Sequence, residues 1–139
     1  SQYDEILQYA SQRGALGILC LESIHGLSYS IKAAVNYLNT LEKPFRMIFM
    51  VADQPYISMN TIDKLMHTKH KLASCAYKDK VGNPTLFDSS YIPELLQLKE
   101  DQGGRKVLNK HPDDVEYIQV ENIRELYDID YQEDLKQLQ

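Results

Sequence analysis

The sequence predicts an α/β domain built around a mostly parallel β-sheet. Short apolar segments of strand length alternate with amphipathic segments of about a dozen residues, an alternation typical of βαβ units. The most apolar segment, residues 45–52, is hydrophobic almost without a break, as expected of a central parallel strand covered on both faces. No repeat, low-complexity tract or linker interrupts the sequence, so we expect one domain over residues 1–139.

Composition narrows the class of protein. Of 139 residues, 43% are hydrophobic and 25% are charged, and the formal net charge is −5. This is ordinary globular composition, and the acidic balance argues against a nucleic-acid or anionic-membrane surface. No segment resembles a membrane span or a signal peptide, so we expect a cytoplasmic protein. Cys20 and Cys75 lie in apolar segments and are expected to be reduced, buried thiols.

Each predicted element follows from a local pattern. Apolar residues at helical spacing predict helices that begin near Tyr3, Ser28, Ser58 or Asn60, and Ser90, and shorter helices over 103–110 and 132–138. Apolar segments bounded by turn residues predict strands over 15–22, 45–52, 72–77, 83–88 and 115–120. Ser28 is the expected N-cap of the second helix, and Gly14 is expected to end the first.

Asp53 ends the apolar segment 45–52 and is the first candidate functional residue. In open parallel sheets, ligands bind beyond the carboxyl ends of the strands, which is where this carboxylate is expected. A carboxylate near the low-dielectric sheet requires a cation or hydrogen-bond donors. The spacing leaves two interpretations open, a metal ligand or a cap of the loop that Pro55 directs away from the strand.

Asp128 and Asp130 form a second acidic group, just before the predicted last helix. Residues two apart in an extended segment point to the same side, so these two carboxylates can converge. Carboxylate ligands, with no His or Cys at metal spacing, favour Mg²⁺ over zinc. The alternative is that Asp130 forms a capping box with Glu133, and one residue could do both.

Five segments, in this order, resemble the MobA-like NTP transferases and most of all the molybdenum cofactor cytidylyltransferases. They are GLSYSIKAA, VADQPYIS, GNPTLFDSSYIPELLQL, EDQGGRKVLNKHPDDVEYIQV and DIDYQEDL. The corresponding family elements are Gly-Leu-Ser-x-Ser, Asp-Gln-Pro, Gly-(His/Asn)-Pro, Gly-Asp-x-Gly-Ala-Arg and Asp-Ile-Asp-Thr. The resemblance covers nearly the whole chain and implies a Rossmann-like, three-layer αβα fold, here incomplete at its amino-terminal side.

The resemblance also implies an activity and a metal site. In this family, the terminal phosphate of a molybdopterin-type cofactor attacks the α-phosphorus of CTP and pyrophosphate leaves. The two aspartates that hold the Mg²⁺ ion match Asp53 and Asp130, and Asp128 lies beside them. Holding a metal suits carboxylates in this chemistry, because the transfer depends on positioning and on neutralising charge.

Other positions carry over from the same resemblance. The nucleotide-binding element matches Gly26, Ser28 and Ser30. The substrate-binding elements match Gly82, Asn83, Pro84, Asp101 and Arg105. Each group also has a structural interpretation, namely an N-cap at Ser28, a plain turn at 82–84 and an exposed helical arginine at position 105.

The sequence departs from the family pattern at several positions. Glu100 and Gly104 stand where the family has Gly and Ala, and Tyr131 and Gln132 where it has Thr and Pro. The family's loop, Leu-Ala-Ala-Gly-x-Ser-x-Arg-x-Gly with a following Lys, does not occur in these 139 residues. By the usual size of such domains, the chain resembles roughly the carboxyl-terminal two-thirds of one of these enzymes.

The missing loop leads to a prediction about residues 1–139 alone. The loop supplies amides and cations that cradle the triphosphate, so we expect weak NTP binding and no pyrophosphate release without it. The candidate substitutes are Lys78, Lys80, Arg105 and Lys106. Loss of a central first strand would leave unpaired sheet edges, through which we expect self-association.

Two alternatives to cytidylyl transfer remain open from the sequence. The acceptor could be a sugar phosphate or another alcohol phosphate, or the chain could be a non-catalytic binding or accessory domain. We expect Asp53 and Asp130 to meet at the carboxyl edge of the sheet if the metal interpretation is right.

Overall fold

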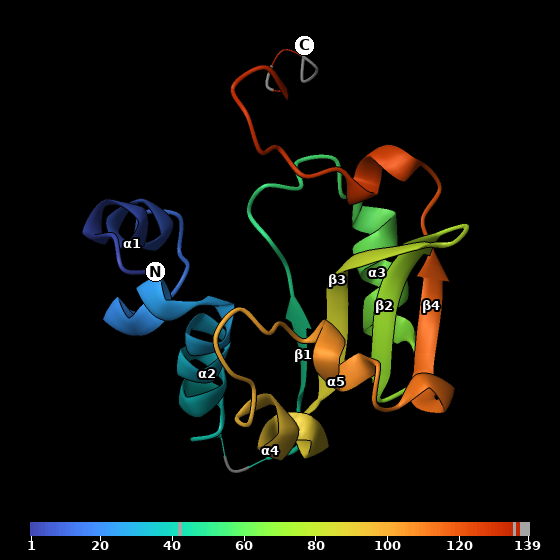
Figure 1. The fold of residues 1–139 in the computed structure, drawn as a ribbon, viewed down its shortest axis with the longest axis horizontal. Coiled ribbons are helices and arrows are strands. Elements are labelled where there is room, and N and C mark those ends of the chain that lie inside the picture. Colours follow the sequence, from blue (N-terminus) through green and yellow to red (C-terminus); the bar gives the residue numbers. More distant parts are fainter. Residues whose placement is uncertain (42, 135, 137–139) are drawn as a thin grey trace. The chain divides into compact units, whose positions relative to one another are not determined.

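The computed structural model describes residues 1–41, 43–134 and 136 (Figure 1). The chain forms two compact units. The helical unit comprises Ser1–Phe45 and Ser89–Lys110, and the sheet unit comprises Arg46–Asp88 and His111–Gln139. The expectation of one domain over residues 1–139 stays a prediction.

The helical unit contains four α-helices in its described residues, and two of them are a single turn long. They are α1 (Asp4–Ser11), α2 (Leu27–Leu38), α4 (Ile92–Leu95) and α5 (Arg105–Leu108). Helix α2 contacts α4 and the 3₁₀ turn that precedes it, Leu21–His25. The buried side chains of Val35, Leu95 and Val107 lie in these helices.

The strand predicted over 15–22 does not form. This segment runs as a loop into the 3₁₀ turn, and the side chains of Leu16, Leu19 and Leu21 are all more than half exposed. An apolar segment becomes a strand only when another strand takes up its backbone hydrogen bonds, and no described strand pairs with this one.

The sheet unit confirms the α/β class. Its described residues form one sheet in the order β1 (Arg46–Phe49), β3 (Lys80–Asp88), β2 (Leu72–Tyr77) and β4 (Val115–Gln119). Strand β3 is antiparallel to both neighbours and β2 is parallel to β4, so β1, β2 and β4 run the same way. Helix α3 (Met59–His67) contacts β2, β3 and β4 and buries Leu65 against them (Figure 1).

The prediction of a central strand over 45–52 is wrong in length and place. Strand β1 ends at Phe49 and lies at one end of the order, paired antiparallel with β3. In the register, the residue opposite Met50 would be Pro84, which has no N–H to extend the ladder. The other edge of β1 pairs with no described strand, and self-association there stays a prediction.

The turn predicted at Gly82, Asn83 and Pro84 is instead part of strand β3. The register with β2 passes from Ser74 opposite Thr85 to Cys75 opposite Gly82, so two residues of β3 bulge out of the ladder. The Ser74 hydroxyl donates to the Gly82 carbonyl oxygen over 2.9 Å. A bulge of this kind re-aims nearby side chains at the end of a strand.

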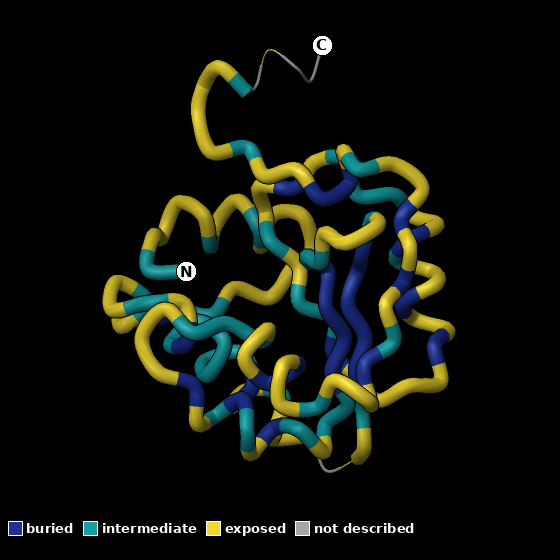
Figure 2. Tube along the Cα trace, turned by 45° about the vertical axis from the view of Figure 1, so that its right-hand side comes forward, coloured by how far each residue is buried: buried dark blue, intermediate teal, exposed yellow. Residues whose placement is uncertain are grey.

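Burial is concentrated in strands β2 and β3, which form the centre of the sheet (Figure 2). Cys20 and Cys75 are both buried and free, as predicted. Burial, reinforced by the charge of Glu125, raises the pKa of Cys75 to about 12, so this thiol stays protonated and unreactive.

Two further expectations concern the predicted carboxyl-terminal helix and membrane-spanning segments. Residues 135, 137 and 138 of the helix predicted over 132–138 lie outside the described residues, and Gln132 and Glu133 lie in a turn. Among the residues that the structure describes, no helix has both the length and the apolar character that crossing a membrane requires.

Candidate functional site

Two acidic segments of the sheet unit lie against each other although about 75 residues separate them. The Ile129 N–H donates to the Asp53 carbonyl oxygen over 2.8 Å. The Gln54 side-chain amide donates to an Asp128 carboxylate oxygen, also over 2.8 Å. The structure therefore brings the segment of Asp53 next to the segment of Asp130. The convergence of the two carboxylates on one site stays a prediction.

The pairing has an antiparallel order. Asp53 meets Ile129, Gln54 meets Asp128, and further along the loop the Ser58 N–H donates to the Glu125 carboxylate over 3.0 Å. The Asp53 side chain is exposed, whereas Gln54 is only 7% exposed. The buried amide thus fixes the loop, and the neighbouring carboxylate faces solvent.

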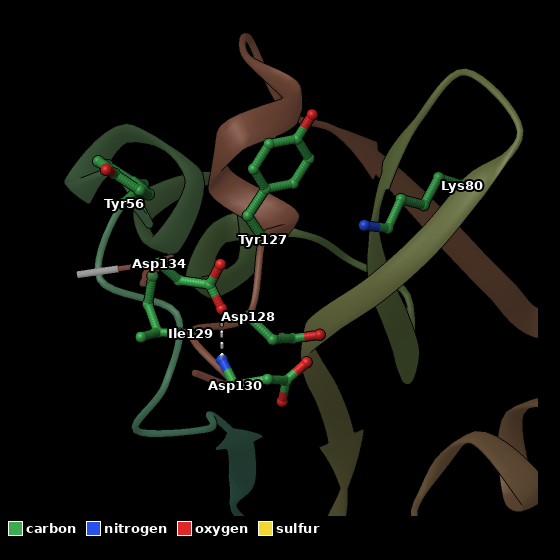
Figure 3. A pocket seen from close by; sticks show the side chains of 7 residues that line it. All are labelled: Tyr56, Lys80, Tyr127, Asp128, Ile129, Asp130 and Asp134. Atoms are coloured by element: carbon green, nitrogen blue, oxygen red, sulfur yellow. Dashed lines mark hydrogen bonds between the residues drawn. The ribbon is translucent and has the colours of Figure 1, made fainter. Parts of the chain in front are cut away.

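A cavity of about 320 Å³ lies beside this pairing (Figure 3). Its lining residues are Tyr56, Lys80, Tyr127, Asp128, Ile129, Asp130 and Asp134. The carboxyl groups of Asp128 and Asp130 point to the same side, and the Ile129 side chain points away from them, as the spacing predicts (Figure 3). Three carboxylates against one lysine give this cavity a negative lining that favours cations.

Lys80 contributes the positive charge of the cavity. Its Nζ atom donates to the Leu126 carbonyl oxygen over 2.9 Å and lies 5.2 Å from the centre of the Tyr127 ring. Of the four basic residues considered as phosphate ligands from the sequence, Lys80 is the one that lines this cavity. Lys78 occupies the turn between β2 and β3, with its ammonium 5.6 Å from the Tyr77 ring.

Asp134 is a site residue that sequence reasoning missed. Its carboxylate accepts hydrogen bonds from the backbone N–H groups of Asp130 and Tyr131, over 3.2 and 2.9 Å. The capping box suggested for Asp130 and Glu133 is therefore replaced by a cap from Asp134. The sequence signal that could have identified Asp134 is a carboxylate four residues after Asp130.

Glu125 is a second residue that the sequence did not reveal. Its side chain is buried, and one carboxylate oxygen accepts from the Ser58 N–H and from the Thr61 hydroxyl, the latter over 2.7 Å. Burial by itself would raise the pKa of Glu125, but the hydrogen bonds from Thr61 and Ser58 outweigh it and lower the pKa. Because its partners lie over 60 positions away, no local pattern marks this residue.

The predicted nucleotide-binding residues belong to the helical unit. Gly26, not Ser28, is the N-cap of α2, so the expected cap is wrong. Ser28 lies in the first turn, fully buried, and its N–H donates to the Glu100 carbonyl oxygen over 2.9 Å. The Ser28 hydroxyl has no hydrogen-bond partner among the described residues. Ser30 is half-buried in the same helix.

Gly26 can hold this position because it has no side chain. Its φ is +130°, and a Cβ atom there would lie 2.4 Å from the Glu100 carbonyl carbon. Glu100 itself has a φ of +49°, a left-handed conformation. This explains why the family pattern has glycine where this chain has Glu100.

The predicted substrate-binding residues fall in both units. Asp101 and Arg105 are exposed residues of the helical unit, whereas Asn83 and Pro84 form the bulge of β3 in the sheet unit and Gly82 is the paired residue next to it. Asp53, Asp128 and Asp130 also belong to the sheet unit.

The donors available for a metal ion are carboxylate oxygens. Among the described residues, no group of three or more His, Cys, Asp or Glu side chains could hold an ion. Mg²⁺ commonly uses one or two carboxylates and completes its shell with water and substrate phosphates. Carboxylates such as those of Asp53 and Asp130 are the donor type that suits an ion arriving with a nucleotide, and their sharing of one ion stays a prediction.

Comparisons with known proteins place the chain in a family. Residues 1–115 match the MobA-like NTP transferase domain family. No curated protein matches the sequence. Rv0371c from Mycobacterium tuberculosis H37Rv has a similar structure, with a TM-score of 0.67 and 23% identity over 80% of this chain. A crystal structure of the same protein in complex with manganese gives a TM-score of 0.63, at 23% identity over 78% of this chain.

A homolog of Rv0371c from Mycobacterium sp. strain JC1 has a TM-score of 0.63 and 22% identity over 89% of this chain. The match covers 58% of the homolog and 58% and 59% of the two Rv0371c chains, so this chain spans little more than half of their length. At these identities the likeness concerns the fold. The chain belongs to the MobA-like NTP transferase domain family.

Proposed function

We propose that this domain carries the metal-holding part of a nucleotidyltransferase site. In this proposal a cytidylyl group moves from CTP to the terminal phosphate of a molybdopterin-type acceptor, and pyrophosphate is released. The observation that carries it is the hydrogen-bonded pairing of the Asp53 and Asp128–Asp130 segments in a member of this family.

The residues of the sheet unit have separate roles in this proposal. Asp53 and Asp130 would hold a Mg²⁺ ion, with Asp128 beside them, and the bound ion would neutralise charge on the phosphates. The Gln54 amide holds the Asp128 carboxylate in place. Lys80 would add a positive charge at the wall of the cavity, opposite the carboxylates, where an acceptor phosphate needs one.

The remaining positions would bind the two substrates. We assign the base and ribose to Gly26, Ser28 and Ser30, an assignment supported by the family match, which covers these residues. For the acceptor we propose the segment of Gly82, Asn83 and Pro84 in the sheet unit and, separately, Asp101 and Arg105 in the helical unit. Nucleophilic attack forms the bond from the acceptor oxygen to the α-phosphorus and breaks the bond to pyrophosphate.

The test is pyrophosphate release and product formation with CTP, ATP, GTP and UTP, each with molybdopterin or a sugar phosphate as acceptor. The assay compares residues 1–139 with a chain that also carries the family's glycine-rich loop ahead of Ser1. We expect Mg²⁺-dependent transfer from CTP only when the loop is present. Asp53→Asn and Asp130→Asn should each slow it by at least about 100-fold, whereas Asp79→Asn in the β2–β3 turn should not.

A second candidate is a non-catalytic binding domain, favoured because Tyr131 and Gln132 stand where the family pattern has Thr and Pro. In that case the ion and the nucleotide bind, but no pyrophosphate appears with any acceptor even when the loop is supplied. Transfer to a sugar phosphate in preference to molybdopterin would instead change the acceptor and keep the enzyme class.

A further inference from the structure

We infer that Glu125 is a positioning residue, which holds the Asp53 loop against the Asp128–Asp130 segment and so sets how the candidate metal ligands face each other. The inference about the loop stands on the contacts of Glu125 alone. Its consequence for metal binding rests on the proposed function.

Glu125 is the acceptor at the centre of a closed hydrogen-bond ring at the start of α3. The Ser58 N–H and the Thr61 hydroxyl both donate to its Oε2 atom, over 3.0 and 2.7 Å. The Ser58 hydroxyl donates to Thr61 Oγ1, and the Thr61 N–H donates back to Ser58 Oγ, both over 3.1 Å. The carboxylate thus lies at the N-terminus of a nine-residue helix, where negative charge is stabilised.

The position of this ring in the antiparallel pairing gives Glu125 its leverage. Ser58 is five residues after Asp53, and Glu125 is five residues before Asp130. The ring therefore closes one end of the pairing, and the contact of Asp53 with Ile129 closes the other. Between them the chain of each segment is short, so a shift at Glu125 is transmitted to the aspartates.

Glu125 is also a shielded contact of the pairing, as Gln54 is further along it. Glu125 is 5% exposed and Thr61 is 1% exposed, whereas Asp53 and Asp128 are exposed residues. A charged hydrogen bond out of water is stronger than one at the surface, so this contact contributes strongly to the pairing. Burying a carboxylate at position 125, next to the buried Leu126, costs free energy that an apolar side chain at the same position would not cost.

Two variants separate positioning from packing. Glu125→Gln keeps an oxygen that can accept from both Ser58 and Thr61, and Glu125→Met keeps the volume but removes the acceptor. The matched control is Glu121→Met. Glu121 also links α3 to the carboxyl-terminal segment, accepting from Asn60 over 2.7 Å and lying 3.6 Å from Lys64, but it is exposed and lies outside the paired segments.

The first readout is amide hydrogen exchange of Ile129, whose N–H reports directly on the contact with Asp53. The second is the affinity for Mn²⁺ measured by electron paramagnetic resonance, with circular dichroism to verify the fold. We expect Glu125→Met to speed exchange at Ile129 by about 10-fold or more and to weaken Mn²⁺ binding by about 10- to 100-fold. Glu125→Gln should restore most of both properties, and Glu121→Met should change neither.

Unchanged exchange at Ile129 in a folded Glu125→Met protein would overturn the inference. If Glu125→Met does not fold, Thr61→Val removes one donor at nearly constant shape and should speed exchange at Ile129 by a smaller factor, and an unchanged rate would overturn it equally. If Glu125→Met speeds exchange at Ile129 but the wild type binds no Mn²⁺, the positioning role is supported and the proposed metal site is rejected.

Discussion

The two units of this protein each join distant segments of the chain, but by different physical means. In the sheet unit, the side chains of Gln54 and Glu125 bridge the Asp53 loop and the 125–130 segment, in addition to one backbone hydrogen bond from Ile129 to Asp53. In the helical unit, two backbones touch, and Gly26 fits against Glu100 because it has no Cβ atom.

The difference predicts how each connection responds to substitution. A side-chain connection survives any residue that presents the same acceptor at the same place, so it depends on chemistry. A backbone contact survives only if no side-chain atom is added between the two backbones, so it depends on the space between them. The predictions below test this contrast, beginning with the largest expected effect.

Gly26→Ala should destabilise the protein by about 3 kcal/mol, because the new Cβ atom would lie 2.4 Å from backbone carbon and φ is +130°. The matched control is Gly14→Ala, at a φ of +80° with nothing within 4 Å, which should cost only about 1 kcal/mol. Urea unfolding of the two variants measures the difference. Equal costs would mean that the contact with Glu100 contributes nothing beyond backbone conformation.

Glu125 should make the sheet unit sensitive to acid. Its pKa in the folded state lies below the ordinary value of 4.5, so its hydrogen bonds stabilise the fold above that pH, and the stabilisation is lost as pH falls through the lowered pKa. Glu125→Gln removes this titration. The loss of unfolding free energy between pH 6 and pH 3 should therefore be smaller in the variant than in the wild type, and an equal loss would contradict the lowered pKa.

Glu100→Gly should stabilise the helical unit by about 0.5 to 1 kcal/mol, the smallest effect of the three. It relieves the left-handed conformation at φ +49° and leaves the backbone carbonyl that accepts from Ser28 in place. Lys78→Gly, at φ +52° in the turn of the sheet unit, should give a similar gain. Thermal melting measures both, and a loss of stability in Glu100→Gly would show that its side chain matters to the contact.

The sequence predicts the elements whose cause is local. Ser58 caps α3, as its type and place indicate, and β2 occupies residues 72–77 as predicted. The segments 15–22 and 45–52 were misjudged because an apolar run does not say which strand will pair with it. Hydrophobicity alone could not separate a loop or an edge strand from a central one.

The residues of the candidate site likewise fall into those that the sequence predicts and those that it does not. The resemblance and the spacing single out Asp53, Asp128 and Asp130, and the structure places their segments together. The sequence does not predict Glu125 and Asp134 as site residues, because the backbone N–H groups that they bind come close to them only in the folded chain. Long-range hydrogen bonds of this kind leave no periodic trace in the sequence.

The most direct test of the metal site is a titration with Mn²⁺, followed by electron paramagnetic resonance and by competition with Mg²⁺. The proteins are the wild type, Asp53→Asn, Asp130→Asn, the double variant and the control Asp79→Asn, each with and without CTP. We predict that either single substitution removes most of the Mg²⁺-sensitive binding, that the double variant is no weaker than the single ones, and that Asp79→Asn binds as the wild type does. Wild-type affinity in both Asp53→Asn and Asp130→Asn would contradict a shared metal site.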